Sequence, residues 1–317
     1  MDQTVTAPGS LADPGAPGSG PAAAAGPPAR LSVAGALRWL RRISGAVPFG
    51  IYVALGLLLP MVAVAIGAFQ GNNGGFTLSN VSAATHGIYL KGFRQSIELS
   101  VFTSILPAIF GLLIAYAIFT AKRGNVLRQV AITASGVFAN FGGVPLAFLF
   151  IASAGSTGLI THWLANIGLN IYSWGFSLYS LSGVIVVYFY FQVPLMVLII
   201  LPALEGLRPA WREAAENLGA RTWQYWRYVG GPVLLPSFMG CVLLLFGSAL
   251  SAYATTEALT NGTIPLTSIQ IGSFLNGNVI AGQENIGKAL GLGMVVIIAI
   301  AMIIYVALQR RAAKWLR

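Results

Sequence analysis

The segment that most resembles a chemical site is 282–289, with the sequence GQENIGKA, which nearly matches the spacing of a phosphate-binding P-loop. A true P-loop follows a strand, and the residue after its lysine carries a hydroxyl that holds Mg²⁺. Here Ala289 takes that place without a hydroxyl, and no strand is expected before the segment. We also expect the segment to lie outside the cell, where ATP is scarce. The chain is therefore not expected to hydrolyse ATP.

Other residue types that serve in catalysis or metal binding are sparse. His86 and His162 lie far apart in predicted outer loops without metal-ligand spacing around them, and the single cysteine, Cys241, lies in an apolar run with no base nearby. The sequence also lacks an HExxH zinc motif and a nucleophile elbow, which disfavours a membrane-embedded enzyme. We predict no catalytic residue, no metal site and no cofactor.

Two carboxylates near apolar segments are candidates for contact with a solute. A charge at bilayer depth costs on the order of 3 kcal/mol and tends to face a pathway. Glu98 and Glu257 fall near the outer ends of their predicted helices, and Thr255 and Thr256 add hydroxyl groups beside Glu257. Together these groups could attract a cation. The alternative is that both carboxylates reach interfacial water.

The run Asn140-Phe141-Gly142-Gly143-Val144-Pro145 interrupts an apolar segment with helix breakers. Non-helical backbone at membrane depth is tolerated where protein or a water-filled cavity satisfies its polar groups. Asn140, Gly142 and Gly143 are therefore candidates for the lining of a solute pathway. A kink that serves only helix packing is an equally valid interpretation.

The composition requires a lipid environment. Hydrophobic residues make up 56% of the 317 residues, charged residues only 8%, and the mean hydropathy is +0.77. A soluble domain carries about a quarter charged residues. The net charge of +10 comes from short basic clusters between apolar runs rather than from one basic face, so a nucleic-acid partner is not expected.

The pattern predicts an all-α polytopic membrane protein with six transmembrane helices, each of roughly 20 apolar residues. A disordered Pro/Gly/Ala-rich tail is expected over 1–30 and an amphipathic surface helix over 31–45. The transmembrane domain is expected over 46–317. Its predicted spans cover about 47–69, 96–119, 129–153, 177–204, 237–257 and 286–308.

The basic residues predict the orientation of these spans. Fifteen of the 18 Lys and Arg residues fall on one set of connections, and only Lys91, Arg94 and Lys288 fall on the other. Lys and Arg are enriched in cytoplasmic loops. Both termini and the loop 205–236 are therefore expected in the cytoplasm, with the loops near 71–95, 154–176 and 258–285 outside.

The loop 205–236 is too polar to span a membrane and has helical signals of its own. Pro209 suits a first helical turn, Gly219 is well placed to end that helix, and Thr222 can cap a second short helix. Its four Arg and three Glu nearly cancel. We expect a helical hairpin on the cytoplasmic membrane surface that fits a groove on another protein.

One motif in this loop resembles a known family. The run Glu213-Ala214-Ala215, Gly219 four residues later, and Val229 and Gly231-Pro232 further on resembles the EAA coupling motif of binding-protein-dependent ABC importer permeases. Val229 replaces the usual Ile and Gly231 replaces the usual Leu. The position of the loop after four helices agrees with the type I importer topology. Outer-loop segments are most similar to the spermidine and putrescine permeases.

The resemblance implies a division of labour among several proteins. A cytoplasmic ATPase dimer would receive the loop through Glu213, Ala214, Ala215, Gly219 and Pro232. A second permease subunit, identical or different, would complete the pathway in the bacterial inner membrane. An extracytoplasmic binding protein would deliver the solute, which the resemblance suggests is a polyamine or another small cation. A self-contained secondary transporter or channel without an ATPase is the alternative function.

Overall fold

The computed structural model describes residues 47–71, 73–121, 124–277 and 283–314. The predicted tail over 1–30 and the predicted surface helix over 31–45 lie outside this part of the chain. The chain divides into two compact units, Met1–Leu57 and Leu58–Arg317. The described part of the first unit consists of α2 (Val47–Val53) and the start of a π-helical turn, η1 (Ala54–Leu58).

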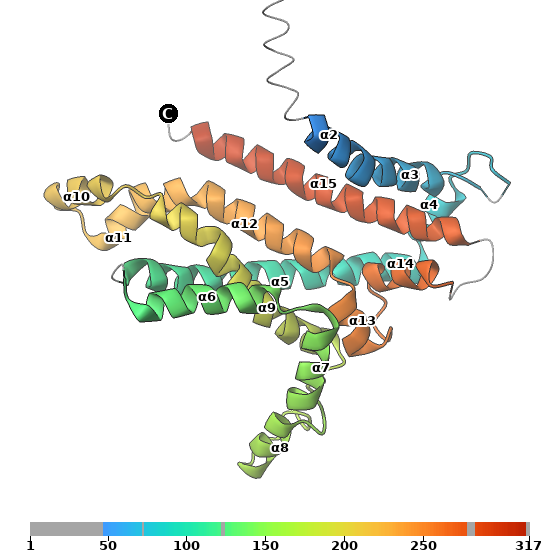
Figure 1. Cartoon of the computed structure of the whole chain (residues 1–317), viewed down its shortest axis with the longest axis horizontal. Helices are drawn as coiled ribbons and strands as arrows, with labels where there is room; N and C mark the ends of the chain where they lie inside the picture. Colours follow the sequence, from blue (N-terminus) through green and yellow to red (C-terminus); the bar gives the residue numbers. More distant parts are fainter. Residues whose placement is uncertain (1–46, 72, 122–123, 278–282, 315–317) are drawn as a thin grey trace, which may run out of the picture. The chain divides into compact units, whose positions relative to one another are not determined.

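The regular elements among the described residues of the second unit are all helices, apart from one isolated bridge between Gln70 and Phe76 (Figure 1). The all-α prediction is therefore confirmed. Its elements are α3 (Leu59–Ala68), α4 (Ser79–Ala84), α5 (Gly87–Thr120), α6 (Val126–Asn140), α7 (Gly143–Ala154), α8 (Leu159–Asn166), α9 (Leu181–Glu205), α10 (Pro209–Asn217), α11 (Thr222–Tyr225), the π-helical η2 (Trp226–Gly230), α12 (Gly231–Ser251), α13 (Ala254–Thr260), α14 (Thr267–Leu275) and α15 (Glu284–Lys314).

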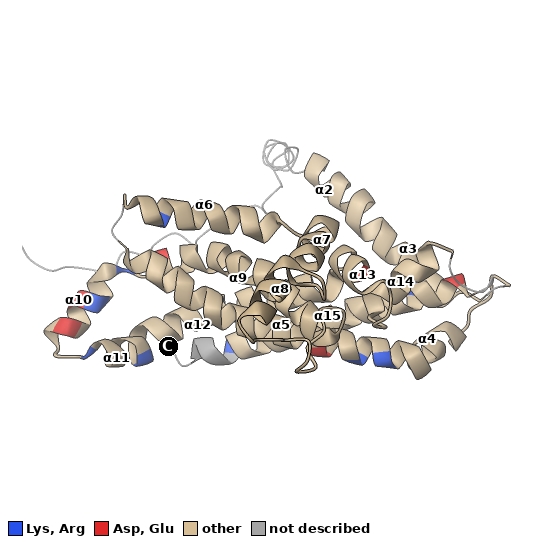
Figure 2. Cartoon of the chain, turned by 90° about the horizontal axis from the view of Figure 1, so that it is seen from below, with Lys and Arg blue, Asp and Glu red and all other residues tan. Residues whose placement is uncertain are grey.

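Six helical segments of the described chain are long and apolar enough to cross a membrane, as predicted. They are Val47–Ala68, Gly87–Thr120, Gly143–Asn166, Leu181–Glu205, Thr222–Ser251 and Glu284–Arg310. Charged residues lie mostly around α10 and α11 and near the start of α5, whereas the middle stretches of the long helices are almost free of charge (Figure 2). This distribution is the one that a lipid-embedded bundle requires.

Two helices, α5 and α9, pack against each other in the centre of the second unit. Small side chains let helix backbones approach closely in lipid, where no hydrophobic force drives helices together. Most of the buried face of α5 is built in this way, from Gly92, Ser96, Ser100, Thr103, Ser104, Pro107, Ala108, Gly111 and Ala115, while Phe93, Leu99 and Ile118 are its larger members. Helix α9 fills the space with large side chains, of which Tyr188, Met196, Ile200 and Leu204 are completely buried.

The predicted third span, 129–153, contains a helix break that falls within the predicted run of helix breakers, 140–145, and the third membrane-spanning segment of the structure is Gly143–Asn166. Helix α6 ends at Asn140 and α7 begins at Gly143, so the helix breaks at Phe141 and Gly142. Gly143 has a φ of +73°, a conformation that glycine adopts without strain, and Pro145 has no N–H with which to continue the helix. A further helix, α8, lies within the region predicted as the loop 154–176.

The prediction of a fifth helix over 237–257 is wrong at both ends. Helix α12 begins at Gly231 and continues η2 and α11, so the helical segment runs from Thr222 to Ser251. Glu257 lies on a separate short helix, α13. The connecting loop is consequently the shorter stretch 206–221, and the predicted second hairpin helix is the first part of the fifth span.

Candidate functional site

The connecting loop contains α10, whose ends are defined by local backbone chemistry. Pro209 occupies the first turn, as predicted. At the other end the N–H of Gly219 donates to the carbonyl oxygen of Glu216 at 2.9 Å, and the N–H of Ala220 donates to that of Ala215 at 3.0 Å. This pair of bonds is a Schellman motif, which requires a left-handed residue after the helix. Gly219 supplies it with a φ of +75°.

Helix α10 has no buried residue. Glu213 and Ala214 are exposed and Ala215 is half-buried, while the Leu218 side chain just after the helix is 87% exposed. Arg212 and Glu216 form an ion pair one turn apart, with 2.9 Å between Nε and Oε1, and this hydrogen bond raises the pKa of Arg212. The Glu213 and Ala214 side chains of the motif are therefore exposed, whereas Ala215 and, at the start of α12, Pro232 are half-buried.

The second half of the motif region begins with a cap that differs from the prediction. Arg221, rather than Thr222, is the N-cap residue, and its N–H donates to the Gln224 side chain at 2.7 Å. Helix α11 then passes through the π-helical turn η2 into α12. A Cβ atom at Gly231 would lie 2.5 Å from the carbonyl oxygen of Trp226. The wide turn thus explains why this chain has glycine where the motif usually has leucine.

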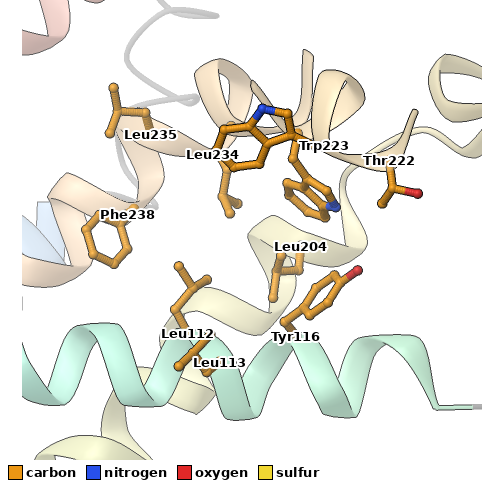
Figure 3. A pocket seen from close by; sticks show the side chains of 11 residues that line it. Leu112, Leu113, Tyr116, Leu204, Thr222, Trp223, Leu234, Leu235 and Phe238 are labelled. Carbon is orange, nitrogen blue, oxygen red and sulfur yellow. The ribbon is translucent and has the colours of Figure 1, made fainter. Parts of the chain in front are cut away.

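A pocket of about 490 Å³ lies beside this turn, between α5, the end of α9 and the start of α12 (Figure 3). Its lining is almost entirely apolar. The residues are Leu112, Leu113, Tyr116, Leu204, Thr222, Trp223, Trp226, Gly231, Leu234, Leu235 and Phe238. Because it offers so few hydrogen-bonding groups, this pocket does not suit a charged solute.

An ion pair lies where the loop leaves α9. Nη2 of Arg128, on the first turn of α6, donates to Oε1 of Glu205, the last residue of α9. The Arg128 side chain is 14% exposed and that of Glu205 40%. In the sequence, Arg128 counts only among the 15 Lys and Arg residues on the predicted cytoplasmic side, and Glu205 is only the first residue of the predicted loop. No spacing rule connects residues 77 positions apart, so this contact required the structure.

The structure brings together the two segments predicted to line the solute pathway. The N–H of Gly143, at the helix break, donates to Oγ1 of Thr255 on α13 at 2.9 Å, and α13 packs against α7. The Asn140 amide instead turns back to the carbonyl oxygen of Gly136 at 2.8 Å. Thr256 is buried, and its hydroxyl donates to the carbonyl oxygen of Tyr253 at 2.8 Å.

The carboxylates differ in their surroundings. Glu257 is half-buried, and its Oε2 atom is buried without a hydrogen-bond partner among the described residues. Glu98 is exposed on α5. Gln192 is not among the predicted site residues, yet it is completely buried in α9 with no hydrogen-bond partner for either amide atom within the described part of the chain. A glutamine inside a predicted span is the signal that could have identified it.

Two described residues of the P-loop-like segment 282–289 contact the end of α3. Lys288 lies on α15, where its Nζ donates to Oδ1 of Asn285 at 2.9 Å and its aliphatic chain crosses Gly67 on α3. The Asn285 amide donates to the carbonyl oxygen of Gln70 at 2.8 Å. Both side chains thus tie the start of α15 to the end of α3.

The family model for the binding-protein-dependent transport system inner membrane component matches residues 52–316. The chain belongs to this family. Members of the family are permease components of membrane transport systems, and α10 lies within the matched region. The motif resemblance in the loop and the six apolar helices agree with this membership.

Two relatives and one solved structure place this permease more closely. It is 29% identical to the thiamine transport permease ThiP of Escherichia coli over 164 residues, which cover 52% of this chain but only 29% of ThiP. It is 28% identical to the sulfate transport permease CysT of the same organism, over 64% of this chain and 69% of CysT. The permease thus spans less than a third of the first of these relatives.

The solved structure is a bacterial alginate ABC transporter in complex with an alginate pentasaccharide-bound periplasmic protein. Its matching chain aligns with a TM-score of 0.69 and 19% identity, over 89% of this permease and 98% of that chain. At this identity the likeness supports the fold. It agrees with the helical architecture described above.

Proposed function

We propose that this permease is a membrane subunit of an ATP-binding-cassette importer and that α10 docks on a cytoplasmic ATPase dimer. The observation that supports this most directly is that α10 is ordered by its own backbone hydrogen bonds and leaves none of its side chains buried. The helix is ended by a Schellman motif and buries no residue in its own chain, and it presents Glu213 and Leu218 to solvent. An amphipathic helix of this kind fits a groove on a partner.

The same proposal includes the orientation of the permease in the membrane, a second permease subunit and a solute-binding protein. We propose that the α10 side and both termini lie in the cytoplasm of a bacterial cell, and the excess of Lys and Arg on this side supports the proposal. A second permease subunit, identical or different, would complete the pathway. The alginate transporter was solved with a periplasmic protein, and by analogy a solute-binding protein would dock on the opposite side here.

The ATPase partner can be tested by co-purification. In Gly219→Ala a left-handed conformation is forced on alanine, which costs about 1–2 kcal/mol, so ATPase recovery should fall about tenfold. Gly206→Ala is the matched control, because Gly206 has a φ of −73° and accepts a side chain. If no ATPase is recovered with the unaltered permease, the self-contained transporter or channel is the better reading.

For the solute we propose a small cation. A half-buried carboxylate with one buried oxygen that has no hydrogen-bond partner among the described residues attracts a cation and repels a dianion such as sulfate, and Glu257 lies beside the helix break. Thiamine, in the name of ThiP, is a cation, so this reading fits that relative better than CysT. Neither relative is named for a polyamine, and the narrower polyamine specificity has no support from them.

Uptake measurements test the charge of the solute. Cells with the complete transporter should accumulate radiolabelled thiamine or spermidine, and Glu257→Gln should reduce that uptake severalfold. Sulfate uptake serves as the comparison. Uptake of sulfate alone, or cation uptake that is the same in Glu257→Gln, would contradict a cationic solute guided by Glu257.

A further inference from the structure

The residue that precedes the loop 206–221, Glu205, forms an ion pair with Arg128 on α6, 77 positions earlier in the sequence. Of the two ion pairs in the described part of the chain, the one between Arg128 and Glu205 joins two separate helices, while the other lies within α10. Glu205 is the last residue of α9 and directly precedes the loop 206–221. Any displacement of the loop therefore acts on this carboxylate first.

The contact is suited to carry force between the two helices. A guanidinium donating to a carboxylate forms a charge-assisted hydrogen bond with fixed directions. The Arg128 side chain is only 14% exposed, which reduces screening by salt, and its Nε has no hydrogen-bond partner among the described residues. Glu205 is thus the main compensation for this buried positive charge.

Helix α6 connects this ion pair to the helix break. Its 15 residues extend for about 22 Å at the rise of an α-helix. Near its far end, Phe138 contacts the ring of Tyr190 on α9 at 5.6 Å between centroids, and Tyr190 also contacts Phe150 on α7 at 5.6 Å. Helix α6 is therefore held to α9 at both ends, by charge near the loop and by aromatic packing near the break.

The break is the point in this arrangement where the helix is interrupted. Backbone continuity as a helix is lost at Phe141 and Gly142, and the first residue of α7, Gly143, is bound through its N–H to Thr255 on α13. A stiff helix that shifts along its axis changes geometry most where it ends. Movement at Arg128 would consequently alter the contact between α7 and α13.

We infer that the Arg128–Glu205 ion pair is the joint that passes movement of the loop 206–221 to α6 and on to the break at Phe141–Gly142. This inference rests on the proposed function, because the ATPase is the source of the movement. Arg128 and Glu205 are positioning residues, since they act through α6 and touch no solute.

A cysteine at the break reports the movement without knowledge of the solute. Gly142→Cys is suitable because Gly142 has a φ of −132° and no atom lies within 4 Å of a new Cβ. Cys241→Ala removes the single native thiol. In the complex with its ATPase, a non-hydrolysable ATP analogue should change the maleimide labelling rate at position 142 by about fivefold, the low end of typical coupling between two sites.

The ion pair is then broken and reversed in this background. Arg128→Gln and Glu205→Gln should each abolish the nucleotide response while the ATPase still co-purifies. The exchange Arg128→Glu with Glu205→Arg should restore it, and Arg128→Lys should retain it because the charge is kept. A pair that only stabilised the fold would change the melting temperature of the complex but not this response. The matched control is Arg310→Gln, which removes an exposed arginine at the end of α15.

The outcomes separate the two proposals. If the ATPase co-purifies and every variant retains the response, or if the charge exchange fails to restore it in an assembled complex, the joint is disproved and the proposed function stands. If the unaltered permease recovers no ATPase, the proposed function itself fails.

Discussion

The α5–α9 core and the α10 loop achieve order in opposite ways. In the core, side chains define the structure: small residues on α5 accept large, fully buried residues of α9. In the loop, the backbone defines it, through a Schellman motif after α10 and a capping contact before α11, while the side chains remain exposed. A chain segment that is ordered without using its side chains for packing leaves them for a partner.

The largest effect is expected where a methyl group enters the core. A Cβ at Gly111 would lie 2.5 Å from Cβ of Met196, so Gly111→Ala should cost about 1–3 kcal/mol through overpacking. The same substitution at Gly136, in the interior of α6, meets no atom within 4 Å and should stabilise the helix by about 0.5–1 kcal/mol. Thermal unfolding of the detergent-solubilised protein compares the two variants. Equal melting temperatures would contradict the close packing of α5 on α9.

An intermediate effect is expected at the π-helical turn between loop and span. Gly231→Ala places a Cβ against the carbonyl oxygen of Trp226, and the half-buried turn can relax only partly, so we expect a loss of about 1 kcal/mol. Gly247→Ala in the same helix is the control, because no atom lies within 4 Å of its new Cβ. A Gly231→Ala variant as stable as the control would mean that α11 and α12 join without this tight contact.

The sequence predicted the regions that follow local rules. Six apolar stretches of sufficient length predicted the number of spans, and Pro209 and Gly219 marked α10 correctly because caps depend on adjacent residues. Hydropathy does not register where a helix breaks inside an apolar run, so the predicted bounds of the third and fifth spans, 129–153 and 237–257, differ from those of the structure. The helix breakers at 140–145 did indicate the break between α6 and α7. The predicted loop 205–236 ends too late, since Pro236 lies inside α12.

The candidate sites also differ in whether local sequence rules could identify them. The motif from Glu213 to Gly219 could be identified from spacing alone, because it occupies one helix and its cap. The bond between Gly143 and Thr255 and the ion pair between Arg128 and Glu205 join residues 112 and 77 positions apart. Such contacts depend on how helices pack, and a single sequence does not contain that information.

The smallest effect is expected for the ion pair on the surface of α10. Both side chains are more than half exposed, and such pairs one turn apart contribute about 0.3–0.5 kcal/mol at low salt. Glu216→Gln should therefore lower the melting temperature very little, and the difference from the unaltered protein should vanish at high salt because the charges are screened. Glu205→Gln, which leaves a mostly buried arginine without its partner, should retain its destabilisation at the same salt concentration. A Glu216→Gln variant as unstable as Gly111→Ala would show that α10 contributes to the core, and the contrast between the two regions would fail.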